Sequence, residues 1–163
     1  MKSQKENSLD KRILSQTTGI ANQLAQILLH DPEVQELQEY ANTVSIRRLN
    51  YNDHGPVHMR KVLINAIQML DLLHDGGVKT SLELDEAGTI EDSRVAVMLA
   101  AFLHDIGMSV GRQNHEMNSA ILAAPVISRI LQTLYPNNIR TQVAIKATAI
   151  EGIEGHMATM RIH

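Results

Sequence analysis

The chain has 163 residues, enough for one domain with a sizeable core but too few for two comfortable ones. Its formal net charge of −3 argues against nucleic acid as a bulk electrostatic partner, and its lack of cysteine excludes disulfides, thiolate zinc sites and cysteine nucleophiles. Aromatic residues make up only 2% of the chain, so aliphatic residues and eight methionines must form the core, which favours helices packed on helices over a β-sandwich.

The longest apolar run, residues 95–103, has about half of the roughly 20 residues that a membrane span needs. The first seven residues are polar and lack the apolar stretch of a signal peptide. A soluble, cytoplasmic protein with no membrane partner is therefore expected.

Apolar periodicity predicts helices in the first half of the chain. One amphipathic pattern covers residues 9 to about 30, and a second helix begins with Asp31 as its cap and Pro32 as its first residue. A third helix is expected from Pro56, after a loop, to Gly76 and Gly77. The long acidic connection that follows, residues 78–90, is the expected site of sequence variability or of a lid.

The second half of the chain predicts three more helices and no strand. Residues 95–103 form the body of a helix that is apolar on every side, which belongs in the centre of a domain, and Gly107 is expected to follow it as a left-handed cap. Residues 115–134, with Asn114 as the cap and a bend at Pro125, and residues 138–152 complete the set. The sequence thus predicts an all-α bundle of about six helices around a buried central helix.

Metal-ligand residue types gather in three short segments, which contain His54 and His58, His104 and Asp105, and His115. Imidazole nitrogen and carboxylate oxygen, without thiolate, suit a divalent ion such as Mn, Fe, Ni, Co, Mg or Zn. Such an ion commonly activates water and neutralises a phosphate, so the segments indicate metal-dependent hydrolysis of a phosphate ester.

The most specific of these segments is the pair His104-Asp105 at the end of the apolar helix. Adjacent helical positions point about 100° apart, so both side chains can reach one ion beyond the helix end, where the helix dipole favours a cation. The alternative is that Asp105 bonds the backbone while His104 is a core imidazole. Burying two polar side chains at the end of an apolar helix costs free energy unless they bind a partner, which favours the interpretation as metal ligands.

These segments resemble the HD phosphohydrolase superfamily over about residues 51–163. The family pattern begins with a His-x-x-x-Val helix start, which His58 and Val62 resemble, and continues with a His-Asp pair closing a buried apolar helix, which His104 and Asp105 resemble. The resemblance implies an HD domain at residues 51–163. Residues 1–50 match no part of the family pattern and are expected to form an N-terminal helical extension packed on the core of that domain.

The resemblance also implies a ligand set. Some members add histidines from later helices, and His115 and His156 resemble those positions, although a solvated helix start is the alternative for His115 and the fold around His156 is open. Of the implied catalytic residues, His54 is expected to contact the substrate or a ligand, Arg112 is the best candidate for a phosphate, and Asp105 is both catalytic and a ligand. The implied metal ligands are His58, His104, Asp105, His115 and His156.

One feature departs from the family pattern, because no Asp follows Asp105 and the family's closing Asp has no counterpart. The later carboxylates are Glu116, Glu151 and Glu154. A truncated chain, a substitute ligand and an incomplete site are the three alternatives, and truncation is the simplest. Truncation would expose apolar surface, favour homo-oligomers and leave hydrolysis weak.

The expected function is a metal-dependent hydrolase that cleaves a phosphate ester of a small metabolite or nucleotide through a metal-activated water. Two alternatives remain open at this point. One is a degenerate, non-catalytic HD domain that binds a nucleotide or a partner, and the other is an iron-dependent oxygenase on the same scaffold.

Overall fold

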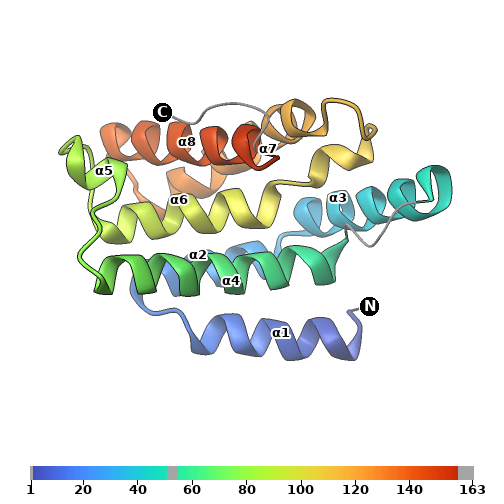
Figure 1. The fold of residues 1–163 in the computed structure, drawn as a ribbon, viewed down its shortest axis with the longest axis horizontal. Coiled ribbons are helices and arrows are strands. Elements are labelled where there is room, and N and C mark those ends of the chain that lie inside the picture. Colours follow the sequence, from blue (N-terminus) through green and yellow to red (C-terminus); the bar gives the residue numbers. More distant parts are fainter. Residues whose placement is uncertain (1, 51–54, 158–163) are drawn as a thin grey trace.

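The computed structural model describes residues 2–50 and 55–157, and every regular element within them is helical (Figure 1). The all-α prediction is confirmed, with eight α-helices, one π-helical turn (η1) and one 3-10 turn (η2) in the described residues rather than about six helices. No helix among these residues is both long and apolar enough to cross a membrane. The elements are α1 (Gln4–Ser15), α2 (Gly19–His30), α3 (Pro32–Thr43), η1 (Val44–Arg48), α4 (Pro56–Asp75), α5 (Ser81–Leu84), α6 (Ile90–Leu103), η2 (Ile106–Ser109), α7 (His115–Leu134) and α8 (Ile139–Gly155).

The apolar helix α6 lies in the centre, as its sequence predicts. It runs between α4 and α8 in Figure 1, and α2 packs against it as well. Val95, Leu99 and Leu103 are fully shielded from solvent, because neighbouring helices cover α6 on several sides. The helix therefore carries its C-terminal residues to a fixed point inside the bundle.

The first predicted helix is divided into α1 and α2, which is one reason why the structure has more helices than the sequence predicts. Ser3 and Glu6 form a capping box that starts α1 at Gln4, before the point where apolar periodicity begins. The chain then breaks before α2, which starts at Gly19 with a φ of +54°. Periodicity missed the break because apolar residues continue on both sides of it.

The expected lid, residues 78–90, contains the short helix α5. A second capping box, formed by Thr80 and Glu83, starts this turn, and the Thr80 hydroxyl lies 2.7 Å from that of Ser93 on α6. The segment is thereby tied to the central helix. Helix α6 itself begins after Thr89, whose side chain accepts a hydrogen bond from the Asp92 amide.

The described residues 2–50 share one hydrophobic core with the later helices. Helix α1 lies along α4, α2 contacts α6 and α7, and α3 contacts η2 (Figure 1). The buried side chain of Gln38 on α3 donates a hydrogen bond to the Phe102 carbonyl, 2.9 Å away, near the end of α6. This bond satisfies a helix-end carbonyl beside His104 that would otherwise be buried without a partner.

Candidate metal centre

Five of the predicted site residues converge from the ends of five elements. His58 lies in the first turn of α4, His104 directly follows α6, Asp105 precedes η2, His115 is the first residue of α7, and His156 directly follows α8. They form two groups of three that could each hold a metal ion, and Asp105 belongs to both groups.

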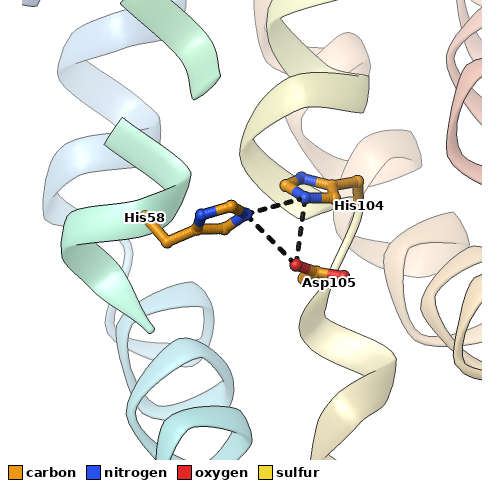
Figure 2. A group of neighbouring side chains, drawn as sticks. All are labelled: His58, His104 and Asp105. Atoms are coloured by element: carbon orange, nitrogen blue, oxygen red, sulfur yellow. Dashed lines mark hydrogen bonds and ion pairs between the residues drawn. The ribbon is translucent and has the colours of Figure 1, made fainter. Parts of the chain in front are cut away.

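The first group joins α4 to the end of α6 and is drawn in Figure 2. The Nε2 atoms of His58 and His104 lie 3.3 and 3.1 Å from Oδ2 of Asp105. The two Nε2 atoms lie 3.3 Å from each other. One ligand atom from α4 and two from the residues that directly follow α6 therefore face a common point.

The second group uses the other oxygen of the same carboxylate. The Nε2 atoms of His115 and His156 lie 3.3 and 3.5 Å from Oδ1 of Asp105. They lie 3.1 Å from each other. The Asp105 side chain is only 4% exposed, so both groups meet at a carboxylate that is shielded from water.

The spacing of these atoms fits metal coordination. Two ligands that are each about 2.1 Å from one ion lie about 3.0 Å apart at a right angle and about 3.4 Å apart at the tetrahedral angle. The separations within the groups, 3.1 to 3.5 Å, fall close to this interval. Each group would supply three protein ligands and leave further coordination positions for water or a substrate.

The tautomers of three histidines also favour a cation. In each ring Nδ1 faces a backbone carbonyl, which can only accept, so Nδ1 carries the proton and a neutral ring has a bare Nε2. In the second group, two bare nitrogens and a carboxylate oxygen then face one another, and a proton or a metal ion must lie among them. The pairs are His104 with the Ala101 carbonyl at 3.0 Å, His115 with the Arg112 carbonyl at 2.9 Å, and His156 with the Ile153 carbonyl at 2.6 Å.

His156 shows how protons compete for this position. Burial lowers its pKa, but the hydrogen bond to Asp105, the Ile153 carbonyl and the nearby negative charges outweigh burial and leave the pKa above its usual value. A proton therefore competes with a metal ion for Nε2, and metal uptake is expected to release protons.

Close contact between η2 and α7 holds the two groups together. A Cβ atom on Gly107 would lie 2.2 Å from the His115 carbonyl oxygen and 2.4 Å from the Ser119 amide nitrogen. The Gly107 amide donates a hydrogen bond to the Ser119 hydroxyl, 2.8 Å away. The expectation of a left-handed cap at Gly107 is wrong, since its φ is not positive. Glycine is needed there because α7 lies against the backbone.

We expect Gly107→Ala to destabilise the protein by about 3 kcal/mol, because the added methyl group must push α7 away from η2. The same shift should separate His115 from Asp105 and weaken metal binding by the second group. Gly111→Ala is the matched control, since a Cβ there meets nothing within 4 Å. Urea unfolding and metal titration of both variants measure the two effects, and equal stability of the two would contradict this role of Gly107.

The remaining predicted site residues have different positions. Arg112 lines a cavity of about 300 Å³ together with the five ligand candidates, which agrees with its predicted place at the site. Arg60, two residues after His58 in the sequence, is 1% exposed and bonded to Asp10. His54 lies outside the described residues.

Sequence reasoning missed two residues that position the ligands, namely Gln38, which donates to the Phe102 carbonyl near the end of α6, and Ser119, whose hydroxyl accepts from the Gly107 amide. A small residue in the family-like segments is a weak signal for such a role, because its partner becomes known only when helices pack. No further carboxylate joins either group among residues 2–50 and 55–157.

The comparisons with known proteins give a relative but no activity. The chain is 38% identical over 127 residues to an uncharacterized protein of Methanocaldococcus jannaschii, a match that covers 78% of this chain and 49% of that protein. The chain thus spans about half the length of the curated relative it matches. No protein-family model matches the chain, and no solved structure matches it.

Proposed function

We propose that the protein is a metal-dependent hydrolase that cleaves a phosphate ester of a small metabolite or nucleotide. The observation that carries the proposal is the position of the Asp105 carboxylate. Each of its two oxygens faces a separate pair of histidine Nε2 atoms. Asp105 would thus contribute to holding a divalent ion with each pair of histidines, and sites with two such ions are typical of phosphoester hydrolysis.

Bound divalent ions would supply Lewis-acid chemistry, which acidifies water and neutralises charge on a phosphate. The chain's own residues would orient them. Hydrogen bonds from Nδ1 to backbone carbonyls fix the rings of His104, His115 and His156, so that little reorganisation is needed on loading. Arg112, on the wall of the same cavity, would contact phosphate oxygens that face away from the ligands.

The test combines metal analysis with a substrate panel. We expect close to two ions per chain after loading with Mn²⁺, and a higher melting temperature in its presence, because a ligand that binds only the folded state stabilises it. A nitrophenyl phosphate monoester and the corresponding diester then report hydrolysis. Metal binding without turnover on any phosphate ester would favour the non-catalytic alternative, and an unchanged melting curve without bound metal would refute the metal site itself.

An iron-dependent oxygenase is the second candidate. Each group consists of two histidines and one carboxylate, a ligand set that non-haem iron(II) oxygenases use with open coordination positions. Iron content and colour after aerobic purification distinguish this candidate, together with oxygen consumption in place of phosphate release.

A further inference from the structure

A second cavity, of about 320 Å³, adjoins the cavity around the ligands. It lies between α4 and α8, the two helices that flank α6 in Figure 1. Val62, His104 and His156 line both cavities, so the two cavities lie side by side against the same residues. We call the second cavity the side groove.

The side groove extends the helix faces that carry the ligands. On α4, Val62 and Ala66 follow His58 at intervals of four residues, which places all three on one face. On α6, the groove residues precede His104 by three, four and seven positions, again on the face of the ligand. These groove residues of α6 are Val97, Ala100 and Ala101.

On α8, Gly152 lines the groove and precedes His156 by four residues, so it lies on the same face of the helix. A Cβ atom there would lie 3.1 Å from that of Ala100, so glycine lets α8 lie close to α6 and carry His156 to Asp105. The small side chains of Ala66, Ala100 and Gly152 leave open space beside the ligands.

The chemistry of the lining restricts what the groove can accept. Apart from the two histidines at its inner end, the described residues that line it carry neither a charge nor a polar side chain. A charged group placed there would lose its hydration without gaining a partner, which is strongly unfavourable. An apolar group would gain from burial.

We infer that the side groove binds the organic part of a phosphate ester whose phosphate lies at the metal ligands, and that this organic part is uncharged and largely apolar. The inference rests on the proposed function, because it takes the phosphate position from it. It excludes substrates that would place a second phosphate in the groove. The substrate class is therefore a phosphate ester with one charged end and an apolar body.

Alkylphosphonates, which have one charged end and resist hydrolysis, test the inference by calorimetric titration of the Mn²⁺-loaded protein. From methyl- to butylphosphonate we expect affinity to rise about two- to fourfold with each methylene group. Butane-1,4-diphosphonate should lose this gain, because its second charge would enter the groove. A flat series, or a diphosphonate that binds as tightly as butylphosphonate, would overturn the inference.

Variants of the groove distinguish its contribution to binding from that of the metal ligands. Ala66→Leu fills the groove and should remove the dependence on chain length while leaving metal content and methylphosphonate affinity unchanged. Ala147→Leu, at an exposed position of α8, is the control and should behave as the parent protein. Val97→Thr, nearly the same shape but polar, provides a second test should the larger side chain disturb folding, and should lower the ratio of butyl- to methylphosphonate affinity about threefold.

The outcomes distinguish the two proposals. Failure of methylphosphonate to bind the loaded protein would refute a phosphate position at the ligands, and the inference with it. Methylphosphonate binding with the same chain-length dependence in Ala66→Leu as in Ala147→Leu would refute the side groove alone.

Discussion

Replacing Asp105 with asparagine is expected to abolish metal binding by both proposed groups, whereas replacing one histidine should abolish it in only one. Asp105 supplies Oδ2 to the first group and Oδ1 to the second, so its neutralisation takes a charge and a ligand from both. Since changes to residues that merely support ligands lower metal affinity by about 10- to 100-fold, loss of this shared ligand should cost at least about 100-fold.

The comparison uses four variants that are analysed for metal content after loading and desalting. Asp105→Asn should retain none, while His58→Ala should lose the ion of the first group and His156→Ala that of the second. Asp75→Asn, an exposed carboxylate at the end of α4, is the matched control and should retain both. Two ions in Asp105→Asn, or none in His58→Ala, would contradict a shared carboxylate between separable groups.

The sequence predicts which residues meet at the site better than how they are grouped. His104 and Asp105 are neighbours at a helix end, so local structure places them together, and His58 in the first turn of α4 meets them because α4 packs along α6. The second group depends on long-range packing, through the contact of Gly107 with Ser119 and the continuation of α8 to Gly155. Periodicity does not report such contacts, because they depend on how closely two helices approach.

The same limit explains the helix count. Apolar periodicity finds faces that are buried, and it correctly predicts α4, α6 and α7. The starts of α1 and α5 are instead marked by capping boxes, at Ser3 and Glu6 for α1 and at Thr80 and Glu83 for α5, which involve polar residues only. Those signals are present in the sequence, but the hydrophobic pattern does not contain them.

Arg60 is the clearest case of a residue whose role is hidden from the sequence. Its Nε atom donates to Oδ1 of Asp10 at 2.6 Å, and its Nη1 atom donates to the Pro56 carbonyl at 2.9 Å and lies 3.7 Å from Oε1 of Glu6. The guanidinium carbon lies 5.6 Å from the centre of the Phe102 ring. In sequence it stands beside Lys61, which is exposed, and the two look equivalent.

Arg60→Met should therefore lower the free energy of unfolding by about 3 to 5 kcal/mol, since it leaves the buried carboxylates of Glu6 and Asp10 without their main partner. Lys2, 2.7 Å from Asp10, offsets part of the loss and favours the lower end of that range. Lys61→Met is the matched control, with an expected change within about 0.5 kcal/mol. Urea unfolding of the two variants gives the comparison.

A combined variant separates the loss of charge pairing from the loss of packing. If unpaired charge causes the destabilisation, then Glu6→Gln and Asp10→Asn should recover much of it when added to Arg60→Met, because no buried charge is then left without a partner. No recovery would assign the loss to packing against Phe102 instead. Because Arg60 anchors the first turn of α4 to α1, its loss should also weaken metal binding by the group that contains His58, while the group of His115 and His156 keeps its ion.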